Sequence, residues 1–163
     1  MIDVLVFVYE NYWRGDACPE AQQLGRKLSA VGFEAEEIEE ALVWLDGLQM
    51  ATRNASPPAA AAEVAGATPL QQSPLSVRVC SVAEQDHLGA QCLGFVRFLE
   101  SAGVLPATMR EIVLDRAMAA RGDPLSLDDL KVIVLMVYWS FGTEPDALVL
   151  DELCDDTLGR VAH

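Results

Sequence analysis

Basic residues are scarce in this chain of 163 residues, and their scarcity argues against several classes of protein. Lysine and arginine together number 11, against 25 aspartates and glutamates, for a formal net charge of −14. Acidic residues outnumber basic ones in residues 1–50 and again in residues 83–163, so the charge does not come from one tail. A surface of this sign repels phosphate and anionic lipid and attracts basic protein surfaces. The composition therefore disfavours direct nucleic-acid and membrane binding and favours a basic protein partner.

Long apolar runs and paired cysteines are also missing. The longest apolar run, residues 132–139, is far shorter than the roughly 20 residues that a membrane-spanning helix needs. The cysteines show no paired spacing, and the chain starts without the basic flank and small-residue cleavage site of a signal peptide. We therefore expect a cytoplasmic protein with reduced thiols and with a buried helix at residues 2–13.

One group of metal-ligating residue types is present, because Cys80, His87 and Cys92 follow the pattern C-x6-H-x4-C. Structural zinc sites favour closely spaced cysteine pairs and four ligands. Here His87 and Cys92 fall roughly 140° apart around a predicted helix, and no second cysteine pair completes the set. Thiols that fill core space explain the pattern better. We expect neither a metal nor any other cofactor.

Catalytic signatures are absent as well. The two histidines, His87 and His163, accompany no Gly-x-Ser-x-Gly elbow and no phosphate-binding glycine loop, since "GAQCLG" lies inside a predicted helix. Adjacent acids occur at 36–37, 39–40, 128–129 and 155–156, but the solvent face of a helix or its first turn, where the dipole favours negative charge, accounts for such pairs. The sequence predicts that the protein is not an enzyme.

Residues 1–50 predict three helices, at about 2–13, 19–30 and 35–50, arranged as a helix-turn-helix or winged-helix-like lobe. Gly32 is a suitable end for the second helix because glycine accepts the left-handed conformation. In the third helix one apolar stripe contains Ile38, Ala41, Leu42, Leu45 and Leu48. The opposite face of this helix contains Glu36, Glu39, Glu40, Val43 and Asp46.

Residues 51–74 are rich in alanine and proline and predict a linker or flexible loop. Directly after it, Leu75, Val77 and Val79 alternate with Ser76, Arg78 and Cys80, which is the period-two pattern of a half-buried strand. We expect at most one small β-hairpin here, paired with residues near 69–71.

The remainder of the chain predicts a four-helix lobe within residues 75–163. Capping-box patterns start at Ser81, Thr108, Ser126 and Thr143, and they place helices at about 82–102, 107–121, 126–141 and 144–159. Gly103 and Gly122 suit helix C-caps. Because 126–141 is apolar almost all round, it is predicted to be the central core helix. The expected fold is mainly α, with both lobes packed as one unit.

Aromatic and acidic residues define a candidate partner-binding surface. Trp44 lies at the flank of the apolar stripe, where it either packs against the first helix or anchors a partner, since Trp and Tyr dominate interface hot spots. The candidate residues of this surface are Trp44, Glu36, Glu40, Tyr12 and Trp13.

Several stretches, in order, resemble the bacterial Smg protein family: "MIDVLVFVYENYW", "LSAVGFEAEEIEEALVWLDGL", "PLSVRVCSVAEQDHLGAQCLGFVRFLESAGVL", "MREIVLDRAM" and "LSLDDLKVIVLMVYWSFG". The resemblance covers nearly the whole chain except the Ala/Pro-rich stretch. It implies no activity, cofactor or catalytic residue to carry over. The family's genes often neighbour those for a DNA-uptake protein and DNA topoisomerase I, which is an associational hint toward nucleic-acid metabolism.

Two functions follow as hypotheses. The first is a non-catalytic acidic helical adaptor of the bacterial cytoplasm that binds a basic protein; its oligomeric state stays open. The alternative is a nucleic-acid-associated winged-helix-like protein, with residues 75–80 as the wing. Electrostatics oppose the alternative, because residues 35–50 hold neither lysine nor arginine to neutralise phosphates.

Overall fold

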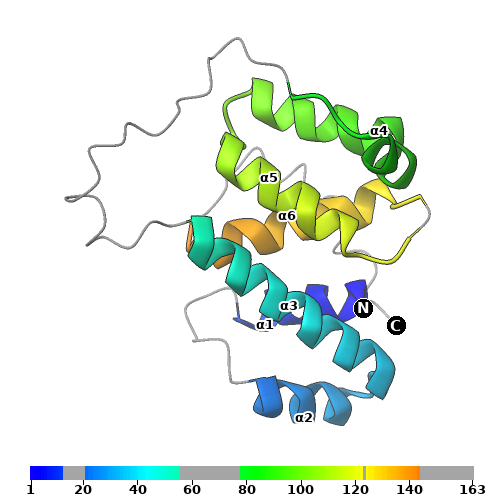
Figure 1. The fold of residues 1–163 in the computed structure, drawn as a ribbon. Coiled ribbons are helices and arrows are strands. Elements are labelled where there is room, and N and C mark those ends of the chain that lie inside the picture. The colour runs from blue at the N-terminus through cyan, green and yellow to red at the C-terminus, as the bar shows by residue number, and fades with distance from the viewer. Residues whose placement is uncertain (13–20, 56–77, 123, 144–163) are drawn as a thin grey trace, which may run out of the picture.

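The computed structural model describes residues 1–12, 21–55, 78–122 and 124–143, and over these ranges the chain is all α (Figure 1). The helices are α1 (Ile2–Tyr12), α2 (Ala21–Val31), α3 (Ala35–Ala55), α4 (Val82–Ser101), α5 (Ala107–Met118) and α6 (Leu127–Ser140). None of these helices combines the length and apolar character needed to cross a membrane. The mainly α fold is confirmed, whereas the predicted helix at 144–159 lies outside the described residues.

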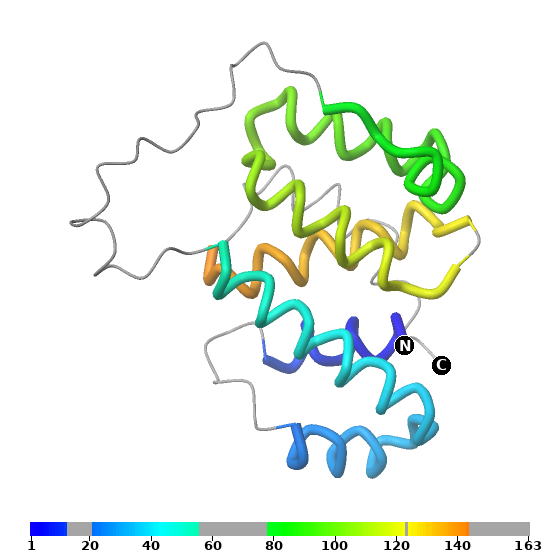
Figure 2. The backbone as a smooth tube through the Cα atoms, viewed as in Figure 1, coloured from blue at the N-terminus to red at the C-terminus, as the bar shows by residue number. Residues whose placement is uncertain are grey.

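Helix α6 is the centre of the core, as its apolar circumference predicts. Residues 130–138 are all buried, and none of them is more than 5% exposed. Helices α1, α3, α4 and α5 all contact α6, and Figure 2 shows α4 and α1 on opposite sides of it. The Ser126 hydroxyl accepts the Asp129 N–H at 3.1 Å, which confirms the predicted N-cap.

Contacts also join the two predicted lobes. Helix α3 packs on α1 and α2, and both α1 and α3 pack on α6. Helix α3 further contacts α5, so the first three helices and the later ones share one hydrophobic cluster. The division into residues 1–50 and 75–163 stays a prediction; among the described helices, α2 packs mainly on α3.

Helix α4 is broken at Gly89, which the sequence analysis placed inside a continuous helix. Gly89 has φ 65° and ψ 174°, a conformation essentially restricted to glycine. The break frees the His87 carbonyl, which accepts the Leu125 N–H at 2.8 Å. The Cys92 thiol donates to the Leu125 carbonyl at 3.4 Å. Hydrogen bonds lost within the helix are thus replaced by bonds to the segment before α6.

A chain of ion pairs links the start of α4 to α5. Arg78 contacts Glu84 at 2.7 Å and Glu111 at 2.9 Å, and Glu111 also pairs with Arg110 at 2.7 Å. Arg110 is only 5% exposed and continues the chain to Glu100 near the end of α4. Its carboxylate partners compensate for the cost of burying this guanidinium.

The predicted strand at 75–80 is wrong over residues 78–80, the part of it that the structure describes. Val79, expected on the buried side, is 85% exposed. Arg78, expected on the solvent side, is only half-exposed because its guanidinium reaches Glu84 and Glu111. Charge pairing therefore sets the orientation of these residues. In the winged-helix interpretation residues 75–80 form the wing, and residues 78–80 do not form the strand that it needs.

Some predicted helix ends and caps differ from those in the structure. Helix α3 continues through residues 51–55 of the predicted linker, whose remaining residues lie outside the described part of the chain. Helix α5 has Pro106 as its N-cap and no side-chain cap, so the predicted box at Thr108 is wrong, because Glu111 is drawn to arginines instead. The capping box of Ser81 and Glu84 is confirmed. Gly103 directly follows the C-cap of α4 with φ 72°, as predicted, whereas Gly122 lies beyond the C-cap of α5.

Gly89→Ala is expected to destabilise the protein by about 1–3 kcal/mol, because a Cβ is strained at this φ and ψ although no neighbour obstructs it. Gly94→Ala is the matched control on the same helix. It is expected to stabilise by roughly 0.5–1 kcal/mol, since Gly94 is helical and open space surrounds it. Urea unfolding measures both variants, and effects of the same sign would contradict the role given to Gly89.

Glu84→Gln is expected to flatten the acid side of the stability profile. Two hydrogen bonds to the Glu84 carboxylate lower its pKa from 4.5 to about 2. The bond from the Arg78 guanidinium has the larger effect, and the bond from the Ser81 N–H has the smaller one. A depressed folded-state pKa stabilises the protein above pH 4.5, and this stabilisation is lost as the pH falls toward 2. Glutamine keeps the capping box but not the charge. When the pH falls from about 5 to about 3, the free energy of unfolding measured with urea is expected to decrease by about 1 kcal/mol more for the wild type than for the variant. Equal decreases in both proteins would contradict this prediction.

Candidate functional site

Helix α3 begins after a tight glycine turn, as the sequence predicts. Gly32 has φ 109°, and the N–H groups of Gly32 and Phe33 both donate to the Leu28 carbonyl, at 3.2 and 3.3 Å. The Phe33 ring then meets Phe7 of α1 edge to face, with centroids 5.7 Å apart. The predicted glycine turn between the second and third helices is therefore present, and the aromatic contact joins it to α1.

Helix α3 has one buried side and one acidic side. Its buried residues are Ile38, Ala41, Trp44, Leu45 and Leu48. On the opposite side Glu36 and Glu39 are exposed, Val43 is 69% exposed, and Glu40 is half-buried. We call Glu36, Glu39, Glu40 and Val43 the acidic face of α3. It combines three carboxylates with one exposed apolar side chain.

A pocket of about 300 Å³ lies along the acidic face, between α3 and the end of α5. Its lining residues are Met1, Glu36, Glu39, Glu40, Val43, Trp44, Arg116, Ala119 and Arg121. Arg121 pairs with Glu40 at 2.5 Å and with Glu36 at 3.7 Å, while its side chain remains 74% exposed. Ion pairs that are this exposed stabilise a protein by at most about 1 kcal/mol. A cation from another molecule can therefore replace Arg121 with little loss of stability.

Trp44 lies under the pocket and not on its rim. The residue is only 3% exposed, and its indole N–H donates to the Arg116 carbonyl of α5 at 3.0 Å. This bond crosses between helices far apart in the sequence and satisfies a polar group that burial would otherwise leave without a partner. Of the two alternatives for Trp44, its burial favours core packing, and its hydrogen bond is made to α5.

Two arginines of the pocket were not recognised from the sequence. Arg116 lies over Gly47 of α3, where an added Cβ would come within 1.9 Å of its Nη1 atom. Its guanidinium also contacts the Asp115 carboxylate at 2.7 Å. Arg116 and Arg121 reach the acidic face only because α5 packs across α3. The glycine at 47, inside a helix, was the one signal of this close approach.

The other candidate residues lie apart from the pocket. Tyr12 is 8% exposed at the end of α1, whereas Met1, beside the opposite end of α1, lines the pocket. The ammonium of Lys27 lies 5.3 Å from the centroid of the Tyr12 ring. Trp13 lies outside the described residues. The structure therefore brings together Trp44, Glu36 and Glu40 but not Tyr12.

Cys80, His87 and Cys92 are engaged in separate contacts. The His87 Nε2 atom lies 3.1 Å from the Ala117 carbonyl, which only accepts hydrogen bonds, so this nitrogen carries the proton. Arg78 contacts the Cys80 sulfur at 3.7 Å, and burial raises the pKa of the Cys92 thiol. Within the described ranges no three histidine, cysteine, aspartate or glutamate residues are placed to hold a metal ion.

Trp44→Phe is expected to destabilise the protein by about 1–2 kcal/mol, because it leaves the Arg116 carbonyl without its donor while keeping most of the ring. Val43→Ala on the neighbouring exposed position is the control and is expected to change stability by less than about 0.5 kcal/mol. Urea unfolding followed by circular dichroism measures both. A neutral Trp44→Phe would mean that Trp44 does not join α3 to α5.

Comparison with known proteins places the whole chain in one family. A family model described as "Protein of unknown function (DUF494)" matches residues 1–163. The chain is 60% identical to the Protein Smg homolog of Leptothrix cholodnii and 58% identical to that of Methylibium petroleiphilum, with 100% of each chain covered. The Protein Smg homolog of Bordetella avium is 47% identical, again over 100% of both chains. No solved structure matches the chain. The resemblance seen in the sequence is therefore confirmed, and the chain belongs to the Smg homolog family.

Proposed function

We propose that this Smg-family protein is a non-catalytic adaptor of the bacterial cytoplasm that binds a basic protein through the acidic face of α3. The observation that carries the proposal is the pairing of Arg121 with Glu40 and Glu36 in the pocket along this face. It is an intramolecular example of the contact that an arginine or lysine of a partner makes there. Arg121, being largely exposed, is free to move aside for it.

The surroundings of the acidic face support the same chemistry. Glu39 is exposed and has no ion pair within the described part of the chain. Val43 offers exposed apolar area beside the carboxylates, and interfaces commonly combine apolar and charged contacts. The net charge of −14 attracts a basic partner over a longer range and speeds its association.

A DNA-binding role for the same helix is disfavoured. In a helix-turn-helix reader the second helix enters the major groove, and Lys or Arg side chains neutralise phosphates. The extension of α3 brings Arg53 onto the helix, but Arg53 lines another cavity and is not part of the acidic face. The face that a groove would receive instead presents carboxylates.

Affinity purification from bacterial lysate tests the proposal, with the full chain as bait and with and without nuclease. Wild-type bait is expected to enrich a basic protein in both samples. The Glu36→Gln/Glu39→Gln double variant is expected to retain at least about threefold less of it at low salt, because rim charges act mainly through screened electrostatics.

Glu10→Gln/Asp86→Asn is the matched control, since it removes the same charge from exposed positions on α1 and α4. It is expected to retain the partner as the wild type does. Equal loss with both double variants would mean that net charge acts without a specific face. Loss of the partner on nuclease treatment would indicate tethering by nucleic acid and would contradict the proposal.

A further inference from the structure

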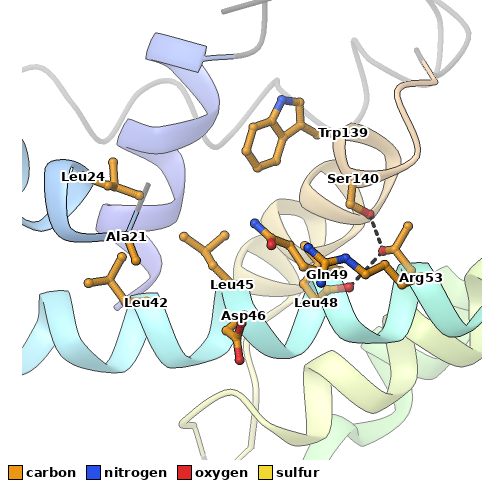
Figure 3. Close-up of a pocket in the computed structure, with 11 residues that line it drawn as sticks. Ala21, Leu24, Leu42, Leu45, Asp46, Leu48, Gln49, Arg53, Trp139 and Ser140 are labelled. Carbon is orange, nitrogen blue, oxygen red and sulfur yellow. Dashed lines mark hydrogen bonds between the residues drawn. The ribbon is translucent and has the colours of Figure 1, made fainter. Parts of the chain in front are cut away.

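A second cavity, of about 560 Å³, opens where α2 begins and where α3 and α6 end (Figure 3). Residues of all three helices line it: Ala21, Leu24, Leu42, Leu45, Asp46, Leu48, Gln49, Thr52, Arg53, Trp139 and Ser140. Its volume lies in the range of about 300–1,000 Å³ that is usual for pockets that bind small molecules. The acidic face of α3 contributes no residue to it.

The inner part of this cavity is apolar. Leu24 of α2 and Leu42 and Leu45 of α3 lie toward the same space as the Trp139 ring of α6 (Figure 3). An apolar chain that enters here leaves water, which contributes about 25 cal/mol for each Å² of apolar surface removed from solvent. The leucines and the indole therefore favour the apolar part of a ligand.

The polar groups of the cavity divide into two hydroxyls that bond to each other and side chains that are exposed to solvent. The hydroxyls of Thr52 and Ser140 lie 2.9 Å apart and bond to each other. By contrast, Arg53 has no hydrogen bond or ion pair within the described part of the chain, and neither does the Gln49 side chain. In Figure 3 Gln49 and Arg53 lie on the side of α3 that faces Trp139, whereas Asp46 points away from it.

We propose that this cavity binds a small amphiphilic anion, with its apolar chain against Leu42, Leu45 and Trp139 and its carboxylate at Arg53. A guanidinium binds a carboxylate in a two-pronged geometry and is the strongest donor that the cavity offers. The acidic surface opposes the approach of any anion, but salt screens this repulsion beyond about 10 Å at 0.1 M. Contacts inside the cavity therefore decide binding.

Titration of the full-length, ¹⁵N-labelled protein with decanoate tests the proposal, with decanol as the uncharged probe of the same chain length. The indole N–H signal of Trp139 is assigned by its loss in Trp139→Phe, and it is expected to shift saturably with decanoate. Arg53→Gln is expected to weaken decanoate binding about tenfold, as loss of a hydrogen bond between charged groups does, and to leave decanol binding unchanged.

Arg97→Gln is the matched control, because Arg97 is exposed on α4 and has no ion pair within the described residues. It is expected to bind decanoate as the wild type does. The proposal is overturned if the Trp139 signal does not shift saturably, as when another part of the chain fills the cavity. It is also overturned if Arg53→Gln leaves decanoate binding unchanged, or if Arg97→Gln weakens it equally. None of these results bears on partner binding at the acidic face of α3.

Discussion

Helix α6 has no side that faces solvent, and the positions of the other helices follow from that constraint. Residues 130–138 include Lys131, which is buried with the rest while its ammonium lies 6.0 Å from the centroid of the Phe95 ring. Such a helix is unstable unless neighbours cover its whole circumference. Helices α1, α3, α4 and α5 supply that cover, although they come from both halves of the sequence. Covering α6 also brings α3 and α5 into contact with each other.

The contact of α3 with α5 in turn builds the candidate site. Trp44 bonds to the backbone of α5, Gly47 leaves room for Arg116, and Arg121 reaches the carboxylates of Glu36 and Glu40. On the outer side of α3, Glu36, Glu39 and Val43 remain exposed. The carboxylates of α3 therefore lie where the first half of the sequence meets the second, beside an exposed valine. One side of α3 therefore packs in the core, and its opposite side is the proposed partner surface.

Helix α3 also separates the two surfaces that we propose to bind ligands. Its acidic face lies near its start, beside the end of α5, and the larger cavity lies toward its other end, beside Trp139. We propose opposite charge preferences for the two, since the carboxylates of Glu36 and Glu39 line the first, whereas the Arg53 guanidinium lines the second and has no ion pair within the described residues. One long helix thus serves both without sharing any residue between them, so each can be altered without the other.

Local signals in the sequence were sufficient wherever neighbours along the chain decide the structure. Apolar spacing predicted the described helices, and Gly32, Ser81 and Ser126 predicted their ends, because such contacts span only a few residues. Prediction failed where a distant partner intervened. Arg78 is held by Glu84 and Glu111 in place of a strand, and Gly89 breaks α4 because Leu125 takes up the freed hydrogen bonds.

The candidate site divides in the same way. The sequence alone determined that the outer side of α3 is acidic and its inner side apolar, since a period of 3.6 residues sorts side chains without knowledge of the fold. Only the tertiary structure decided that Trp44 is buried, that Arg116 and Arg121 join Glu36 and Glu40, and that Arg53 meets Trp139 at a cavity. These side chains are far apart in the sequence, and the packing of helices around α6 is what brings them to common sites.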